Sequence, residues 1–381
     1  RRGLNAYLKT FRAPQLQRFV AEDFANPKVL DEFQPAAKGG MVRAYGPELL
    51  VHVWAGNVPG LPLWSLVCGL LVKAPAVGKV ASAEPLFAAL FARLLAEVEP
   101  RLAEALAIVW FKGGDTASER ALFTEADVVL AYGGNATLAA LREQVPVTTR
   151  FLPHGHKLSV GLVSAAALDA QRLPTVARAA ALDVVRYEQQ GCYSPHTFYV
   201  ARGGRVKPQE FAQALAGQLA ALQHKFVRRP LTLEEAASVA TWRQGQELRG
   251  YASAAVQLMG DAEAPWAVAY ADEAGPLQPS ALNRTVQVQA VDTLLDAVPL
   301  LAAQREVLQT VGIAATPQEL HALAGPLGEA GATRLCALGR MTAPEAGWHH
   351  DGRFSLLDLV RMVELEQSAE DAAELYAPYR D

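Results

Sequence analysis

The stretch ADVVLAYGGN, residues 126–135, places an apolar run directly before a glycine turn and the start of an amphipathic segment. The same alternation precedes it, because residues 76–81 (AVGKVA) and 108–112 are typical of strands, whereas residues 84–98 repeat apolar side chains at helical spacing. Nucleotide-binding sheets are built from consecutive strand–helix units of about 30 residues. The sequence therefore predicts an α/β fold with a largely parallel sheet.

A second α/β region follows in the chain. Strands are predicted at residues 157–164, 197–201, 284–291, 308–314 and 333–338, with helices at 173–187 and 209–222. The segment 245–279 is less periodic, and we interpret it as an insertion or a surface excursion. Because a single hydrophobic core rarely grows past roughly 250–300 residues, a chain of 381 residues predicts two or three domains.

Composition and charge exclude several classes of function. The net charge is 35 − 39 = −4, without the basic excess that nucleic-acid binding requires. No apolar run approaches the roughly 20 residues that span a bilayer, and no signal-peptide core follows residues 1–3. Three cysteines without a CxxC pair do not form a disulfide framework and predict a reducing, cytoplasmic setting. The missing initiator Met predicts that N-terminal sequence is absent.

Cys192 is the first candidate for a catalytic residue. It lies in the segment EQQGCYSPH, a loop flanked by glycine and proline between a predicted helix and a predicted strand. A thiolate is the strongest nucleophile that a side chain offers near neutral pH. The alternative is a small buried apolar residue, the usual state of a cysteine in a reducing compartment. Cys68 and Cys336 lie inside apolar runs and are predicted to pack in the core.

Polar groups and glycines also follow other predicted strands. Asn57 comes after the apolar stretch 49–54, where its amide either stabilises a developing oxyanion or forms only a local turn. Gly133 and Gly134 precede a predicted helix and could hold a pyrophosphate on free backbone N–H groups, although any strand–helix turn can use glycines. Both positions thus remain open between a ligand-binding and a structural role.

Lys79, Ser82 and two histidine pairs complete the set of candidates. Lys79 ends an apolar strand, so its ammonium group either reaches solvent at the strand end or contacts an anionic or hydroxylated ligand. Ser82 either belongs to the same site or caps the next helix. The segments HGH (154–156) and HHDGR (349–353) have no further His or Cys at ligand spacing, and no metal site is predicted.

Together these segments resemble the aldehyde dehydrogenase superfamily, and most closely its fatty acyl-CoA (acyl-protein thioester) reductase branch known from bacterial luminescence. The resemblance covers nearly the whole chain and is carried by GNVPGLPLWSL, PHGHKLS, YEQQGCYSPH and LGRMTAPEAGWHHDGR, followed by a helix at 355–364. It implies an α/β, aldehyde dehydrogenase-like fold with a Rossmann-type cofactor domain, an α/β catalytic domain and a small β oligomerisation hairpin. The implied domains are residues 1–38 and 54–155 for cofactor binding, 156–345 for catalysis, 39–53 and about 370–381 for oligomerisation, and 346–369 for the return to the cofactor domain and its interface.

The resemblance also implies residue roles. Cys192 would be the nucleophile, with the Asn57 amide and the Cys192 backbone N–H as the oxyanion hole, although Gly and Gln before the cysteine stand in altered order. Either His154 or His156 would transfer a proton. The cofactor-binding positions would be Trp54, Lys79, Ser82, Gly133 and Gly134.

Two departures from the superfamily pattern define the expected reaction. Aligning PHGHKLS on Lys157 puts Pro153 where oxidising members have the glutamate that activates water, which favours exchange with a thiol over hydrolysis. Ser82 stands where NAD-preferring members carry a glutamate, and a carboxylate there would repel a 2′-phosphate. NADPH is therefore favoured over NADH.

The predicted function is the NADPH-dependent reduction of a fatty acyl thioester to the aldehyde through a thioacyl intermediate on Cys192. The donor would be acyl-CoA, an acyl carrier or an acyl-protein, and the enzyme would be a homodimer or larger homo-oligomer, with a fatty-acid reductase complex as a further expected assembly. The alternatives are an acyl-phosphate reductase of the same superfamily, a cofactor-free acyl transferase or thioesterase that uses Cys192 with His196, and a non-catalytic subunit of a reductase assembly.

Overall fold

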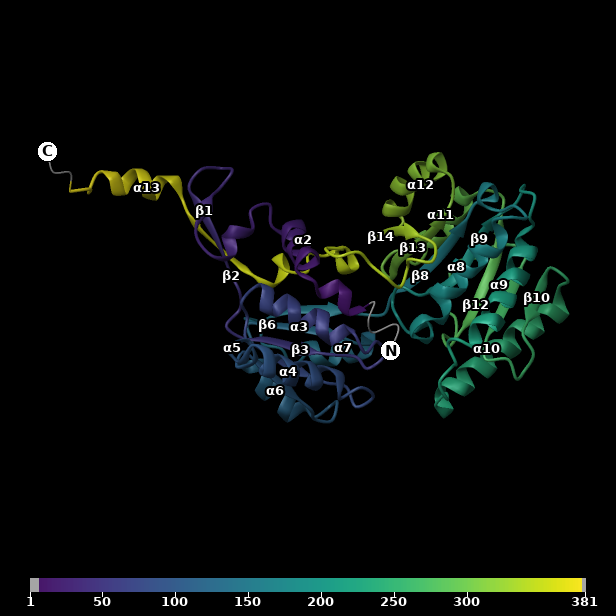
Figure 1. Ribbon diagram of the computed structural model, residues 1–381, viewed down its shortest axis with the longest axis horizontal. Helices are drawn as coiled ribbons and strands as arrows, with labels where there is room; N and C mark the ends of the chain where they lie inside the picture. Colours follow the sequence, from purple (N-terminus) through teal and green to yellow (C-terminus); the bar gives the residue numbers. More distant parts are fainter. Residues whose placement is uncertain (1–6, 379–381) are drawn as a thin grey trace. The chain divides into compact units, whose positions relative to one another are not determined.

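The computed structural model describes residues 7–378, so the ends of the predicted segments 1–38 and 370–381 lie outside the described residues. The chain divides into two compact units (Figure 1). The first unit consists of Arg1–Gly155 together with Glu345–Asp381, and the second unit is His156–Pro344. Among the described residues, no helix is both long enough and apolar enough to cross a membrane.

The first unit is built on a parallel sheet of five strands in the order β5-β4-β3-β6-β7. The strands are β3 (Leu50–Val53), β4 (Ala76–Lys79), β5 (Leu106–Val109), β6 (Val128–Tyr132) and β7 (Arg150–His154). The chain begins at the centre with β3, moves outward to β5, and then crosses to β6 and β7. This order confirms the predicted α/β architecture. The order in which the chain adds strands reverses between β3 and β6. Open sheets of this kind bind ligands at such a reversal, at the carboxyl ends of the strands.

Helices cover both faces of this sheet. Leu66 of α3 packs with Leu50 on one face, and Phe123 of α6 packs with Val51 on the other. Strands that are buried on both faces need continuous apolar runs, such as the one that forms β6. The helices of the first unit are α2 (Ala13–Asp23), α3 (Leu61–Leu71), α4 (Phe87–Val98), α5 (Pro100–Ala103), α6 (Thr116–Thr124), α7 (Asn135–Arg142) and α13 (Gln367–Glu374).

A second, antiparallel sheet in the first unit shows that the predicted hairpin at 39–53 is wrong. Strand β2 (Met41–Tyr45) pairs with β1 (Gln34–Pro35) and with β15 (Arg361–Leu365), while β3 lies in the parallel sheet (Figure 1). The physical reason is burial, since every residue of β3 is buried whereas β2 is only half-buried. A fully buried strand is stabilised at the centre of a covered sheet rather than in an exposed hairpin.

The helix predicted at 355–364 is also wrong. A short 3-10 turn (Leu357–Leu359) is followed there by β15. The backbone of β15 finds its hydrogen-bond partners in β2, about 320 positions earlier in the chain (Arg361 opposite Tyr45). A pairing over that separation leaves no local periodicity for sequence analysis to detect.

The second unit is built on a sheet of seven strands in the order β10-β11-β12-β9-β8-β13-β14. All neighbours are parallel except β10, which is antiparallel to β11. The elements are β8 (Leu158–Val163), β9 (Pro195–Ala201), β10 (Val256–Met259), β11 (Ala267–Ala271), β12 (Thr285–Val291), β13 (Leu308–Ala314) and β14 (Arg334–Ala337), with α8 (Leu173–Val185), α9 (Pro208–Gln223), α10 (Leu233–Ala252), α11 (Ala297–Ala302) and α12 (Pro317–Glu329). Helices α8 and α9 cover one face, and α11 and α12 cover the other.

The interpretation of residues 245–279 as an irregular insertion is wrong. The segment contains the end of the 20-residue helix α10 and the regular strands β10 and β11. Helix α10 buries only Val239 among apolar side chains, and its other buried residues are Arg243 and Gln246. The Arg243 guanidinium donates to four backbone carbonyl oxygens of residues 260–266, at 2.6 to 3.1 Å. A helix that is anchored through polar groups shows no apolar periodicity, which is why the pattern failed here.

Candidate active site

Cys192 lies in a short, partly buried loop between the 3-10 turn Arg186–Gln189 and β9. Three consecutive residues before the loop have left-handed backbone angles, with φ of 53° at Tyr187, 53° at Glu188 and 63° at Gln189. Each such conformation costs a non-glycine residue about 1–3 kcal/mol and persists only when surrounding contacts hold it. The segment that carries the candidate nucleophile is therefore maintained by its neighbours.

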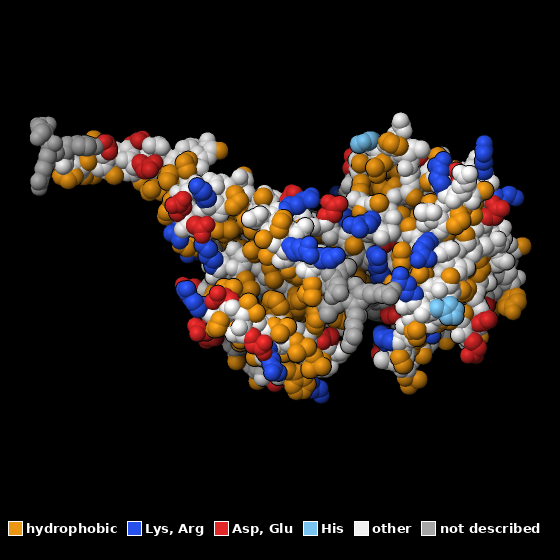
Figure 2. Space-filling model, viewed as in Figure 1, with side chains coloured by type: hydrophobic (Ala, Val, Ile, Leu, Met, Phe, Trp, Pro, Cys, Tyr) orange, Lys and Arg blue, Asp and Glu red, His pale blue; other side chains and the backbone are white. Residues whose placement is uncertain are grey.

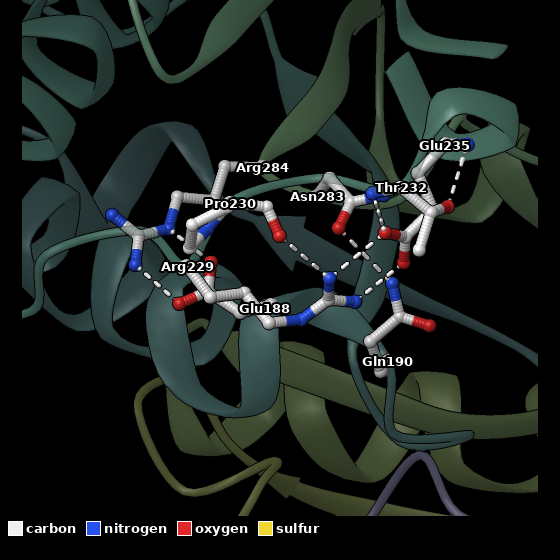
Figure 3. Close-up of polar contacts among 8 residues, drawn as sticks. All are labelled: Glu188, Gln190, Arg229, Pro230, Thr232, Glu235, Asn283 and Arg284. Carbon is white, nitrogen blue, oxygen red and sulfur yellow. Dashed lines mark hydrogen bonds and ion pairs between the residues drawn. The ribbon is translucent and has the colours of Figure 1, made fainter. Parts of the chain in front are cut away.

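An ion pair holds the first part of this segment. Both carboxylate oxygens of Glu188 accept hydrogen bonds from Arg284, at 2.8 Å from Nε and 2.7 Å from Nη2 (Figure 3). The Arg284 side chain is completely buried and also donates from Nη1 to Gln223 Oε1 at 2.6 Å. The bidentate geometry fixes the Glu188 carboxylate in position as well as attracting it.

The arginine belongs to a second left-handed segment that faces the first. Residues Leu282, Asn283 and Arg284 have φ values of 57°, 50° and 71°. The Asn283 N–H donates to the Glu188 carbonyl oxygen at 3.1 Å, and its side-chain Oδ1 accepts from Gln190 Nε2 at 3.2 Å (Figure 3). The two strained segments thus hold each other through backbone and side-chain hydrogen bonds.

Gln189 joins the two sides of the Cys192 loop. Its buried Nε2 donates to the carbonyl oxygens of Pro195 at 2.7 Å and Thr285 at 2.9 Å, and its Oε1 accepts the Arg284 N–H at 3.0 Å. Because Gln189 precedes Cys192 and Pro195 follows it, one side chain closes the loop around the cysteine.

Ser159 anchors the cysteine itself. Its buried hydroxyl donates to the Cys192 carbonyl oxygen at 2.7 Å and accepts the Thr310 N–H at 3.1 Å. The ladders of β8 with β9 and with β13 both shift register at this level, and the inserted hydroxyl replaces the ladder bond that Thr310 lacks. Sequence reasoning missed Ser159, since a serine in an apolar strand carries no signal of what its hydroxyl binds.

His196 does not suit the role of a base for Cys192. Its Nδ1 accepts the Ser280 backbone N–H at 3.0 Å, which places the single proton of the neutral ring on Nε2. Burial also lowers its pKa to about 3. The geometry therefore argues against the cofactor-free reaction that pairs these two residues.

The other two cysteines differ from each other. Cys68 is buried in the core of the first unit, which confirms its predicted place, and burial raises its pKa to about 12. Cys336 is only partly buried, because it lies on the edge strand β14, so its predicted place in the core needs correction. Burial nevertheless raises the pKa of Cys336 to about 11. Neither thiol is prepared to react as a thiolate near neutral pH.

The remaining predicted residues of the first unit follow strands of its parallel sheet. Asn57 is exposed in the loop between β3 and α3. Gly134 caps α7, and a Cβ added there would meet no atom within 4 Å, so the space before this helix is open. Gly133 donates its N–H to the His154 carbonyl oxygen at 3.2 Å, which corrects the expectation of a free donor at that position.

Lys79 and Ser82 lie near two aromatic residues that sequence reasoning missed. Lys79 is buried at the end of β4, with Nζ 5.4 Å from the ring centroid of Phe111. Trp110 donates its indole N–H to the exposed Ser82 Oγ at 3.3 Å while the indole itself stays largely exposed. In the sequence both aromatic residues fall inside the predicted strand 108–112, whereas the observed strand β5 ends at Val109 and leaves the aromatic pair just beyond it.

The assignment of Trp54 as a cofactor contact needs correction for its side chain. The indole is 3% exposed and belongs to the core of the first unit. A Cβ added at Gly78 would lie 2.0 Å from the Trp54 ring, so the glycine makes room for it within the sheet. The side chain packs the core because it follows the central strand β3 and turns under β4.

In the first unit, His154 of the segment 154–156 contacts His350 and Asp351 of the segment 349–353. His154 Nδ1 lies 2.7 Å from Asp351 Oδ2, and the ligand atoms of His154, His350 and Asp351 lie within 4.8 Å of one another. His156 belongs to the second unit, where burial lowers its pKa. The His350 and Asp351 contacts with His154 were not visible from sequence spacing.

A family model described as acyl-CoA reductase (LuxC) matches residues 1–362 of the chain. The chain belongs to the acyl-CoA reductase (LuxC) family. Among similar proteins, the long-chain acyl-protein thioester reductase 2 of Photobacterium leiognathi is 26% identical over 359 residues, covering 92% of this chain and 71% of that protein. The long-chain acyl-protein thioester reductase of Photorhabdus luminescens is 26% identical over 367 residues, covering 94% and 72%.

Solved structures show which fold this acyl-CoA reductase family member has. The putative aldehyde dehydrogenase PutA of Anabaena variabilis aligns with a TM-score of 0.69 at 14% identity, covering 95% of this chain and 80% of that one. The indole-3-acetaldehyde dehydrogenase AldA of P. syringae, solved as a mutant with NAD+ and IAA, aligns with a TM-score of 0.67 at 14% identity, covering 88% and 71%. The predicted aldehyde dehydrogenase-like fold is confirmed, and the chain is an oxidoreductase of the acyl reductase class.

Proposed function

We propose that this protein reduces a fatty acyl thioester to the aldehyde with NADPH, through a thioacyl intermediate on Cys192. The observation that carries the proposal is the loop itself, in which three left-handed residues and the side chains of Glu188, Gln189 and Ser159 fix one partly buried cysteine. Strain that is held by this many contacts is characteristic of functional sites. The raised pKa values of Cys68 and Cys336, which disfavour their thiolates, support the choice of Cys192 among the three cysteines.

In the proposed reaction the Cys192 thiolate adds to the carbonyl carbon of the acyl thioester. The C–S bond to the donor then breaks, and its electron pair leaves with the thiol sulfur. The Asn57 amide and the Cys192 backbone N–H stabilise the oxyanion, in the roles that the family resemblance implies. NADPH, when bound, supplies the hydride that converts the thioacyl carbonyl to the aldehyde level, and the Cys192 thiolate is released when the aldehyde forms.

The position of Pro153 supports reduction over hydrolysis. Pro153 lies in β7, where oxidising aldehyde dehydrogenases carry the glutamate that activates water in the alignment on Lys157. A proline offers no base, so the thioacyl group is protected from attack by an activated water at this position. His154 or His156 would transfer the proton that the departing thiol takes up.

The cofactor site that we propose uses the carboxyl ends of β4 and β6. The open N-terminus of α7 at Gly134 suits a pyrophosphate, and the buried ammonium of Lys79 with the hydroxyl of Ser82 suits the adenosine ribose. Ser82 brings no negative charge near a 2′-phosphate, and Lys79 brings a positive one.

A glutamate at position 82 tests the cofactor preference. We expect Ser82→Glu to raise the KM for NADPH by about tenfold, because two like charges about 4 Å apart at a partly exposed site repel by about 1 kcal/mol or more. The KM for NADH should change less than threefold. Steady-state rates with each cofactor measure both values. An unchanged ratio of the two kcat/KM values would contradict the placement of the ribose at Ser82.

A covalent adduct tests the proposed intermediate. We expect protein mixed with a long-chain acyl-CoA, without cofactor, to gain the mass of one acyl group on the peptide that contains Cys192. Hydroxylamine should remove the group, as it does from thioesters, and NADPH should release it as aldehyde. Acylation through a thioester in Cys192→Ser would refute this intermediate.

The partners that we propose are an acyl donor and a second copy of the chain. The named relatives are acyl-protein thioester reductases, which supports a protein-bound donor beside acyl-CoA. Apolar side chains remain exposed on β15 and after α13, and Figure 2 shows them along this C-terminal segment. They are Met362, Leu365, Leu375 and Tyr376. We propose this surface, together with β1 and β2, as the oligomerisation element in place of the hairpin.

A further inference from the structure

A cluster of aromatic rings lies where β6 and β7 end in the first unit. Tyr132 ends β6 and His154 ends β7, and their nearly parallel rings have centroids 4.7 Å apart. His350, from the turn His350–Gly352, lies 4.5 Å from His154 between ring centroids, and Trp348 lies 4.9 Å from His350. Two flat neighbours on His154 restrict the rotation of its ring.

A carboxylate fixes which nitrogen of His154 carries a proton. Asp351 Oδ2 lies 2.7 Å from His154 Nδ1, and the two side chains are only 9% and 11% exposed. An ionised carboxylate accepts hydrogen bonds and cannot donate them, so the proton lies on Nδ1. Nε2 is then the nitrogen that exchanges a proton, in both the neutral ring and the imidazolium.

The backbone of Asp351 is strained in a way that presents this carboxylate. Its φ is 56°, in the left-handed region, and Gly352 follows with φ of 73°. Aspartate and asparagine tolerate this region better than other residues with a side chain, although it still costs free energy. Strain of this kind at a largely buried charged contact is typical of functional sites.

The aromatic cluster lies at the edge of the sheet where a ligand would bind. The carboxyl ends of parallel strands are where open α/β sheets bind ligands. His154 accepts the Gly133 N–H on its carbonyl oxygen at 3.2 Å, so its backbone is joined to the glycine turn after β6. The imidazole therefore lies at the functional edge of this unit and not in its core.

We propose that His154 is the acid–base residue for the proton that thioester reduction takes up, and that Asp351 is the positioning residue that fixes its tautomer. This inference rests on the proposed function. In the overall reaction the acyl carbon gains a hydride, the C–S bond breaks with its electron pair on sulfur, and the thiolate takes one proton to become the thiol. His154 Nε2–H donates that proton and regains one from water.

The geometry favours this role over a metal site. Two ligand atoms of one tetrahedral zinc, each about 2.0–2.1 Å from the ion, lie about 3.3 Å apart. The 2.7 Å between His154 Nδ1 and Asp351 Oδ2 is instead the length of a charge-assisted hydrogen bond.

The test is Asp351→Asn, which keeps the shape of the side chain and the left-handed backbone but removes the charge. We expect kcat with acyl-CoA to fall about 10²-fold, the usual contribution of a positioned acid–base group, while KM stays within threefold. His349→Asn is the matched control, because His349 contacts Phe354 and lies near Asp23 instead; its kcat should stay within threefold. His154→Ala should lose at least as much kcat as Asp351→Asn and regain part of it with added imidazole.

Three outcomes would overturn the inference. A kcat of Asp351→Asn within threefold of the unsubstituted protein would remove the role of Asp351. Activity that is lost on chelation and restored by zinc would make the cluster a metal site. If the unsubstituted protein forms no aldehyde from acyl-CoA and NADPH, the proposed function itself is refuted. A thioacyl adduct in that experiment would show that acylation occurred and that reduction failed.

Discussion

Replacement of Cys192 by alanine is expected to lower turnover of acyl-CoA by about 10³-fold or more, since removing a catalytic nucleophile abolishes the covalent route. The fold should remain, because the partly buried cysteine is held through its backbone, and alanine keeps the carbonyl oxygen that Ser159 binds. Aldehyde formation measures the loss, and thermal unfolding measures whether the protein stays folded.

Cys336→Ala is the matched control for this experiment. Cys336 is likewise partly buried in the second unit, but burial raises its pKa to about 11. Its removal should change turnover less than threefold. Equal losses in the two variants, or full turnover in Cys192→Ala, would contradict the role of Cys192 as nucleophile.

Arg284→Met is expected to destabilise the protein by about 3–5 kcal/mol, the usual cost of removing one partner from a buried ion pair. The substitution leaves the Glu188 carboxylate, which is 18% exposed, and the partly buried Gln223 amide oxygen without their guanidinium donors. Arg284 has a left-handed backbone, and this conformation costs methionine about the same free energy as arginine. The change in the free energy of unfolding therefore reports the loss of the side-chain contacts. Denaturant unfolding measures the free energy.

Arg229→Met provides the control, since Arg229 forms a comparable but more exposed ion pair in the same region (Figure 3). Arg229 also pairs with a carboxylate through both Nη atoms, that of Glu235, but the two side chains are 45% and 23% exposed. Exposed pairs contribute about 0–1 kcal/mol, so this variant should lose less than about 1 kcal/mol. If the two variants lose equal stability, burial of the Arg284 pair does not have the effect that we assign to it.

The parallel sheets of both units were predictable from local patterns. Residues 308–314 form a strand with the predicted bounds, because a strand buried on both faces must be a short apolar run. The pattern failed where the deciding partners are distant or polar. Strand β15 depends on β2, and helix α10 is anchored through Arg243 rather than through an apolar stripe.

Some residues of the candidate site were likewise predictable from the sequence, and others were not. The sequence indicated Cys192 and Asn57 because each is a polar or reactive side chain in a loop next to an apolar segment. Such a pattern is visible in a few neighbouring residues. It could not indicate Ser159, Arg284 or Asp351. Their importance lies in atoms that they touch 33, 96 and 197 positions away in the chain.

By itself, the sequence indicated the α/β class, the acyl reductase family and Cys192 as the candidate nucleophile, because apolar periodicity and motif order are properties of neighbouring residues. Only the tertiary structure decided which strands of residues 39–53 pair, that Trp54 packs the core, and that His154 is bound by Asp351 while His156 lies in the other unit. The physical reason is that pairing, burial and hydrogen bonding depend on distance in space, which local sequence does not record.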